Sequence, residues 1–186
     1  MQFNKHSNLK GMHSFLGASK YHWTNYSDEK LIEVYKNSAA AQRGSELHEL
    51  AADLIRLGVK LARSNKTLNL FVNDAIGYRM AAEQILFYSP NCFGTADAIK
   101  FDGKLLRIHD LKTGTTPTSI RQLEVYAAMF CLEYMVEPED IKMELRIYQE
   151  DEVLVAEPTA EAIRAYCQKI VHFDRLIEDL KMEMGE

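Results

Sequence analysis

Two aspartates and a lysine lie within one short stretch, GTADAIKFDGKLLRIHDLKTG, which otherwise reads as two buried strands joined by a turn. Asp97 stands on the first expected strand, and Asp110 and Lys112 stand on the second. A carboxylate on an apolar sheet face is costly unless it is paired or binds a metal. Two acids with an amine beside them are typical of a divalent-cation site that can hydrolyse a phosphate ester.

The turn between these strands sets which groups meet. An Asp-Gly pair favours a two-residue hairpin loop, which here predicts Phe101 opposite Lys104. Because cross-strand partners share a sheet face, Asp97, Asp110 and Lys112 then lie together on the apolar face, with the two aspartates as diagonal neighbours about 7–8 Å apart at Cα. A bound divalent cation would remove their mutual repulsion. An ion pair of the lysine with either acid, without any chemistry, is the open alternative.

Four further residues are candidates, each with an ordinary alternative. His48 lies on a long helix one turn after Gly44, which would let the helix approach the sheet closely; it is either a metal ligand or a partly buried histidine bonded to backbone. Gln122 and Tyr126 lie one turn apart on the helix after the lysine strand. They either reach into the site, or form a Ser-x-x-Gln capping box and ordinary packing. Glu83 is either a further acid near the metal or a surface residue.

The elements expected around these groups form an α/β fold, a mixed central β-sheet flanked by helices. Residues 1–27 read as irregular. Apolar periodicity and capping signals predict helices over about 28–37, 39–63, 73–80, 117–134 and 158–186. Strands are expected over about 83–88, 94–101, 104–111, 141–149 and 153–156.

Composition sets broad limits on the class of protein. The chain has 186 residues, of which 47% are apolar and 26% charged, as expected for one globular domain. It has no apolar run approaching about 18 residues and no secretory leader pattern, so we expect a cytoplasmic protein without membrane contact. Its three cysteines, Cys92, Cys131 and Cys167, are isolated, which fits a reducing compartment.

The charge balance bears on a nucleic-acid partner. The net charge of −5 argues mildly against one, because phosphate binding depends largely on lysine and arginine. It does not exclude a local basic surface. Lys20, Arg43 and Arg121 are weak candidates for contacts to a phosphodiester backbone, although surface charges of this kind are usually only solvated.

The candidate groups occur in a definite order along the chain: Gly44-x3-His48, Glu83, Gly94-x2-Asp97, Asp110-Leu111-Lys112 and Gln122-x3-Tyr126. In order, approximate spacing and expected element type, across about residues 14–150, this set resembles the PD-(D/E)XK nuclease superfamily. Within it, the set is most similar to the RecB-type exonuclease branch, which includes CRISPR-associated and phage exonucleases.

The resemblance implies a restriction-endonuclease-like fold with an α-β-β-β-α-β core, in a single nuclease domain over residues 1–186. It also implies the ligands of Mg²⁺ or Mn²⁺, which are His48, Asp97, Asp110 and the Leu111 carbonyl. Lys112 would be catalytic together with both aspartates. Gln122 and Tyr126 would support the site near the substrate, and Glu83 would be an accessory acid. Related branches often carry four cysteines for an iron–sulfur cluster, so three scattered cysteines predict no cluster here.

The function that the resemblance implies is a free-standing, metal-dependent DNA exonuclease. Its substrate would be single-stranded DNA or a duplex end, in end processing or recombination, plausibly as a phage protein in the host cytoplasm. Two alternatives stay open: a non-catalytic nucleic-acid-binding or assembly protein on the same scaffold, and an endonuclease or RNase of the same fold. A homo-oligomer or a recombination partner protein also stays open.

Overall fold

The structure is a computed structural model that describes residues 14–185, apart from the side chain of Lys20. Contacts divide the chain into two compact units, Met1–Arg43 and Gly44–Glu186. The single nuclease domain expected from the sequence stays a prediction, and each unit is described by itself.

The first unit holds a short 3-10 helix, η2 (Ala18–Asn25), within the segment expected to be irregular, and the start of α1 (Asp28–Leu57). Trp23 Nε1 donates a hydrogen bond to the Gly17 carbonyl at 3.1 Å. The ring of Phe15 meets Tyr35 edge-on, with centroids 5.2 Å apart. Packing between aromatic side chains and helix α1 therefore organises this part of the chain.

The second unit is built on a five-stranded open sheet with strand order β1-β2-β3-β4-β5. The strands are β1 (Ala81–Ser89), β2 (Cys92–Phe101), β3 (Leu105–Leu111), β4 (Lys142–Gln149) and β5 (Glu152–Ala156). β3 and β4 are parallel, and the other neighbours are antiparallel. The predicted α/β class with a mixed sheet flanked by helices is therefore confirmed.

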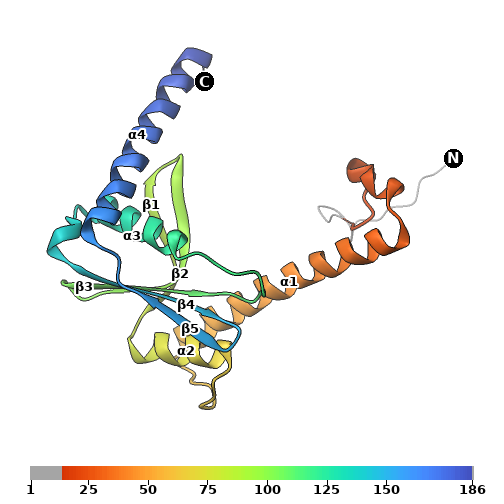
Figure 1. Cartoon of the computed structure of the whole chain (residues 1–186), viewed down its shortest axis with the longest axis horizontal. Coiled ribbons are helices and arrows are strands. Elements are labelled where there is room, and N and C mark those ends of the chain that lie inside the picture. The colour runs from red at the N-terminus through yellow and green to blue at the C-terminus, as the bar shows by residue number, and fades with distance from the viewer. Residues whose placement is uncertain (1–13, 186) are drawn as a thin grey trace, which may run out of the picture. The chain divides into compact units, whose positions relative to one another are not determined.

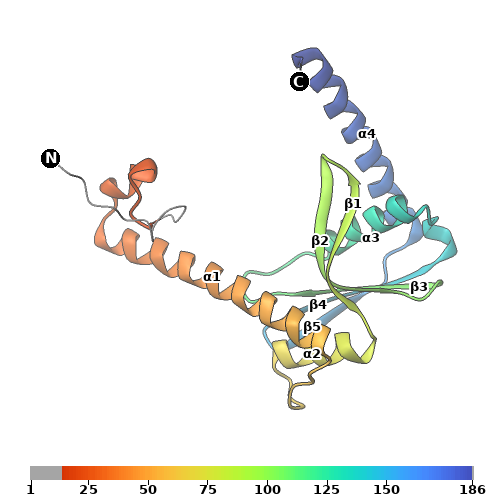
Figure 2. The same cartoon turned by 180° about the vertical axis from the view of Figure 1, so that it is seen from behind.

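Helices cover both faces of this sheet, with α3 on one side and α2 on the other (Figures 1 and 2). They are α2 (Thr67–Gly77), α3 (Arg121–Tyr134) and α4 (Ala160–Met184), with a short 3-10 turn, η3 (Pro138–Asp140), before β4. One core joins the sheet to α3 and α4, and it includes Ile108 and Leu123. A second core joins the opposite face to α2 and the last turns of α1, and it includes Leu111 and Phe71. Because β3 contributes to both cores, it is buried on both faces, as a central strand with a parallel neighbour usually is.

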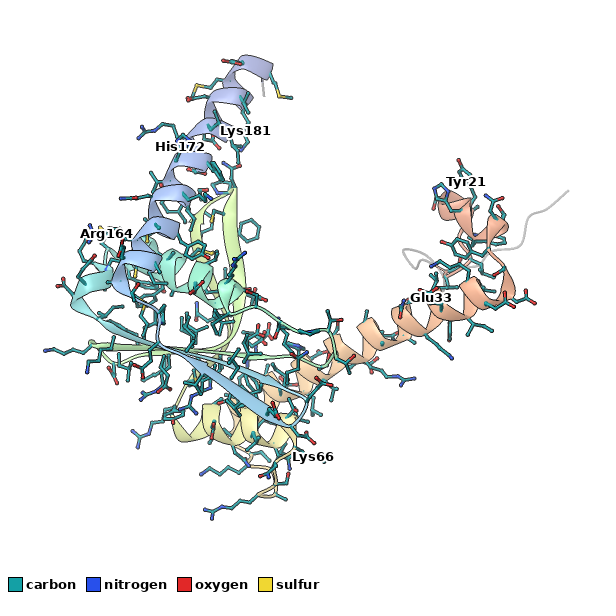
Figure 3. All side chains as sticks on the ribbon, in the orientation of Figure 1. Tyr21, Glu33, Lys66, Arg164, His172 and Lys181 are labelled. Atoms are coloured by element: carbon teal, nitrogen blue, oxygen red, sulfur yellow. The ribbon has the colours of Figure 1, made fainter. Side chains whose placement is uncertain are left out.

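Long polar side chains attach α4 to the tip of the β1–β2 hairpin. Lys181 points toward the hairpin in Figure 3, and its Nζ donates hydrogen bonds to Asn91 Oδ1 at 2.6 Å and Glu178 Oε1 at 2.9 Å. Ser89 and Asn91 both donate to Asp174. Apolar packing therefore holds the first turns of α4, and hydrogen bonds to the hairpin tip hold its later turns.

The β2–β3 hairpin has a register different from the predicted one. Phe101 pairs with Leu106, so the loop residues are Gly103 and Lys104. Gly103 has φ +91, and the Asp102 side chain accepts the N–H of Leu105 at 2.9 Å. Asp102 therefore closes the turn instead of lying inside it. The pairing moves by two residues, an even number, so the side chains of β3 keep the faces that the prediction gave them.

The predicted strict alternation of faces is wrong at the middle of β2. Pairing with β1 skips from Ala82–Ala98 to Gln84–Ala96, and Glu83, which would face Asp97, has φ +53. As a result Ala96 lies in the same core as Ile99, three residues later. The face expected to be more polar is also buried, because Ala98 and Leu111 join the second core.

Four helix predictions need correction. The helices expected over 28–37 and 39–63 form one helix, α1, because nothing between them interrupts it, and it ends at Leu57, before Gly58 with φ +68. The short helix expected over 73–80 begins earlier, at Thr67. The helix expected from residue 117 begins at Arg121. Within residues 14–185, no helix combines the length and apolar composition that crossing a membrane requires.

Candidate active site

Three acidic or imidazole side chains meet where β1 and β2 fail to pair. One ligand atom each from His48, Glu83 and Asp97 lies within 4.8 Å of the others. His48 comes from α1, Glu83 from β1 and Asp97 from β2. His48 Nδ1 lies 3.3 Å from Asp97 Oδ2, which also accepts the backbone N–H of Leu111 at 2.8 Å. Carboxylate oxygens suit hard divalent cations and an imidazole nitrogen suits transition metals, so the three groups could hold a divalent metal ion.

The backbone of Glu83 stores strain at this point. Its φ of +53 is in the left-handed region, which costs about 1–2 kcal/mol for a residue with a side chain. Glycine would adopt it freely, yet the chain has glutamate here. This conformation occurs where the β1–β2 ladder is interrupted opposite Asp97, and the Glu83 carboxylate belongs to the group of three. The structure thus groups Glu83, predicted as an accessory acid, with His48 and Asp97.

Electrostatic coupling links the members of this cluster. The hydrogen bond between the His48 ring and the Asp97 carboxylate raises the pKa of His48, and burial of the ring opposes that shift. Burial, followed by repulsion from Asp97, raises the pKa of Glu83. The Asp97 carboxylate contributes to both shifts, and a bound cation would offset its charge and that of Glu83.

Asp110 is the most buried member of the site, and its side chain is only 3% exposed. Burial, and then repulsion from Asp97, raises its pKa to about 6. Its Oδ1 accepts a hydrogen bond from Lys112 Nζ at 3.1 Å. Its Oδ2 lies 3.0 Å from the same nitrogen, but in the described part of the chain it has no hydrogen-bond partner. Asp110 Oδ2 is therefore paired with the lysine by charge alone, and a buried carboxylate oxygen without a hydrogen bond keeps acceptor capacity that a cation could use.

Lys112 joins the acids to helix α3. Besides its contact with Asp110, its Nζ donates to Gln122 Oε1 at 2.9 Å, and Gln122 Nε2 donates to Tyr126 OH at 3.4 Å. The ion pair of Asp110 with Lys112, the ordinary alternative, is thus present. The capping box proposed for Gln122 is wrong, because the N-cap of α3 is Ile120, without a side-chain cap.

Two glycines permit the close approaches that the site requires. A Cβ on Gly44 would lie 2.8 Å from Thr113 Oγ1, directly after the lysine strand. The expectation that Gly44 lets its helix approach closely is therefore confirmed, and His48 follows one turn later. A Cβ on Gly94 would lie 2.9 Å from Tyr126 Cε1. Gly94 thus leaves room for the tyrosine ring against β2.

Other predicted residues are less defined. Arg43 and Arg121 are exposed, and the side chain of Lys20 lies outside the described part of the chain. The Leu111 N–H binds Asp97, while the proposed role of its carbonyl stays a prediction. The cysteines are free thiols at three separate positions.

The polar network that holds β3 and Lys112 in place was not predicted from the sequence. Lys112 N–H donates to the Tyr148 carbonyl at 2.9 Å, and Tyr148 OH donates to Asp74 Oδ2 at 2.8 Å. His109 Nδ1 lies 3.2 Å from the same hydroxyl. Burial, followed by repulsion from nearby arginines, lowers the pKa of His109 to about 3, so the buried ring is neutral. The signal available was polar residues at buried positions of β3 and β4, since such residues need partners.

No family model, curated protein or solved structure matches this chain. The chemistry of the site therefore has to be inferred from its own geometry.

Proposed function

We propose that this chain is a metal-dependent nuclease of the PD-(D/E)XK type, an exonuclease that hydrolyses phosphodiester bonds of DNA in end processing or recombination. The observation that carries the proposal is the convergence of His48, Glu83 and Asp97 beside a buried Asp110 that is paired with a lysine. The α-β-β-β-α-β order of α1, β1, β2, β3, α3 and β4, with α2 inserted, supports the restriction-endonuclease-like core.

The residues fit a divalent cation. Glu83 and Asp97 offer carboxylate oxygens and His48 offers a ring nitrogen. Beside them, Asp110 Oδ2 is a buried oxygen that forms an ion pair with Lys112 but no hydrogen bond among residues 14–185. Such a donor set favours Mg²⁺ or Mn²⁺. When bound, the ion supplies Lewis-acid polarisation of a phosphate oxygen and lowers the pKa of a water.

The chain's own residues supply position and charge. Lys112 Nζ has three N–H groups, of which one binds Asp110 and one binds Gln122. The third is available to donate to a phosphate oxygen or to the attacking water, where the ammonium offsets developing negative charge. Gln122 and Asp110 restrict the amine to this direction, and Tyr126 holds Gln122 in turn.

The test is cleavage of end-labelled linear and closed circular DNA, single- and double-stranded, and of RNA, with Mg²⁺, Mn²⁺ or EDTA. We expect metal-dependent degradation of linear DNA. Lys112→Ala should lower the rate by about 100-fold or more with the fold unchanged by circular dichroism. Lys142→Ala, at an exposed lysine of the neighbouring strand β4, is the matched control.

Each other outcome points to a different protein. Wild-type rates in Lys112→Ala would refute the catalytic assignment. Metal-independent binding without cleavage would favour the non-catalytic nucleic-acid-binding alternative. Cleavage of closed circles or of RNA would identify an endonuclease or an RNase.

A further inference from the structure

A pocket of about 250 Å³ adjoins the candidate active site, and Lys112 lines it. Its apolar lining comes from three leucines on three elements: Leu47 on α1, Leu68 on α2 and Leu111 on β3. Leu47 directly precedes His48 in the chain, and Leu111 directly follows Asp110. Lys112 both lines the pocket and binds Asp110, so a molecule that reaches Lys112 also meets the pocket.

Hydrogen bonds fix two walls of this pocket. At the α2 wall, the Asp151 carboxylate accepts the Thr67 N–H at 2.9 Å and pairs with Lys66 Nζ at 2.6 Å; Figure 3 labels Lys66 beside this helix. At the loop after β3, Gln149 Nε2 donates to the carbonyls of Gly114 and Thr116. The walls are held by the fold itself, so the pocket exists before any ligand binds.

The chemistry of the lining indicates what it binds. Most of the lining is apolar; three of its nine residues are leucines, three are threonines, and the exposed residue Glu150 lies among them. An exposed acid beside the pocket disfavours a phosphate inside it, whereas Lys112 attracts one. A carboxylate also accepts hydrogen bonds from the amino and ring N–H groups of nucleobases. The volume is below that of pockets for drug-sized ligands, about 300–1,000 Å³, so the occupant is small.

We propose that this pocket receives one unstacked nucleobase, that of the nucleotide next to the phosphate held at Lys112. The inference rests on the proposed function and specifies its substrate. A base inside a duplex must leave its stack and its pair to enter, and this costs least for a single strand or a frayed end. The pocket therefore assigns single-stranded DNA, or a duplex end that opens, as the substrate.

The first test is an abasic scan. Single-stranded oligonucleotides carry one tetrahydrofuran abasic residue at successive positions, and kcat/KM is measured at each phosphate. Loss of one base should slow cleavage of its neighbouring phosphate by about tenfold or more, the usual scale for one base contact. Equal rates at every position would overturn the proposal.

The second test fills the pocket. Leu68→Trp should lower kcat/KM on intact DNA and abolish the difference between intact and abasic substrates. Leu154→Trp, at an exposed leucine of β5, is the matched control and should keep that difference. Thermal unfolding checks that both variants fold. Where Leu68→Trp does not, Glu150→Gln takes its place, and it should change the preference among the four bases at that position. An unchanged difference in Leu68→Trp, or an unchanged preference in Glu150→Gln, contradicts the proposal.

A binding measurement separates this inference from the proposed function. Single-stranded DNA with 2-aminopurine at one position is titrated with the protein in EDTA. Fluorescence should rise at the position whose base leaves the stack, and the rise should be lost in the pocket variant. Absence of metal-dependent cleavage, with the rise present, refutes the nuclease and keeps the pocket. Cleavage with a flat scan and flat fluorescence refutes the pocket and keeps the nuclease.

Discussion

The buried carboxylate of Asp110 makes the stability of the metal-free protein depend on pH in a direction opposite to that of most acids. Burial raises its pKa from the ordinary 3.8 to about 6, so the folded state binds the proton more tightly than the unfolded state. The stabilising effect of the proton is fully present below pH 3.8. It is lost as the pH rises through about 6, because ionisation then leaves a charge in an apolar environment.

The size of the effect follows from the two pKa values. A difference between 3.8 and about 6, at about 1.4 kcal/mol for each pH unit, corresponds to about 3 kcal/mol. The comparison is with Asp110→Asn, which has nearly the same shape and no charge. A fixed cost of burying the amide shifts all values for the variant equally, so only the change with pH reports the ionisation.

The assay is urea unfolding in EDTA at pH values from 4 to 7.5. The free energy of unfolding of the wild type, relative to Asp110→Asn, should fall by about 2.4 kcal/mol across this range, since part of the full effect lies below pH 4. Asp102→Asn serves as the control: backbone hydrogen bonds from Leu105 and Lys104 lower the pKa of that exposed acid from its ordinary 3.8, so its stability contribution is lost only at pH values below this range and its difference from the wild type should be nearly flat across it. A wild-type advantage that is flat, or that grows with pH, would refute the reasoning, since it would mean that Lys112 keeps Asp110 ionised.

Three further predictions follow from backbone and site geometry. Gly44→Ala should lower the free energy of unfolding by about 1–3 kcal/mol, because the Cβ of the new alanine would lie too close to Thr113 Oγ1. Adding Thr113→Ala should restore much of this loss, and thermal unfolding of the single and double variants measures both effects. Met135→Gly should raise the free energy of unfolding by about 1 kcal/mol, since the methionine is 91% exposed with φ +53; an unchanged urea midpoint would contradict this. Mn²⁺ at 100 times its dissociation constant should stabilise the wild type by about 2.7 kcal/mol, and Glu83→Gln should need more Mn²⁺ for the same gain; equal titration curves in differential scanning fluorimetry would exclude Glu83 as a ligand.

Sequence patterns predicted which helices and strands form more accurately than the residues at which they begin and end. Period-two alternation located β4, and the helix expected from residue 158 begins at Ala160, after Thr159, whose side chain accepts the Ala162 N–H. The hairpin register was wrong because the Asp102 side chain takes a hydrogen bond that an ideal two-residue loop gives to backbone. The register error was two residues, and an even shift leaves each side chain of β3 on its predicted face. Asp110 and Lys112 were therefore assigned to the correct face, although an error of one residue would have assigned them to the opposite face.

The features of the site that escaped prediction depend on long-range contacts. The left-handed backbone of Glu83 has no local signal, because glutamate is not a residue that favours positive φ. The bond from Lys112 to Gln122 joins a strand to a helix across an irregular loop, so spacing alone left it undecided. The pocket beside Lys112 depends on Asp151, whose contacts with Thr67 span 84 residues of sequence.

The parallel pairing of β3 with β4 also sets the order in which the protein becomes complete during synthesis. Leu111 lies opposite Tyr148, so the strand that carries Asp110 and Lys112 gains this neighbour only after α3 and most of β4 have left the ribosome. Without β4, the two residues would lie on the outer strand of the sheet. A chain that ends before β4 lacks the strand that lies beside Asp110, so the proposed metal site would be complete only after β4 has paired.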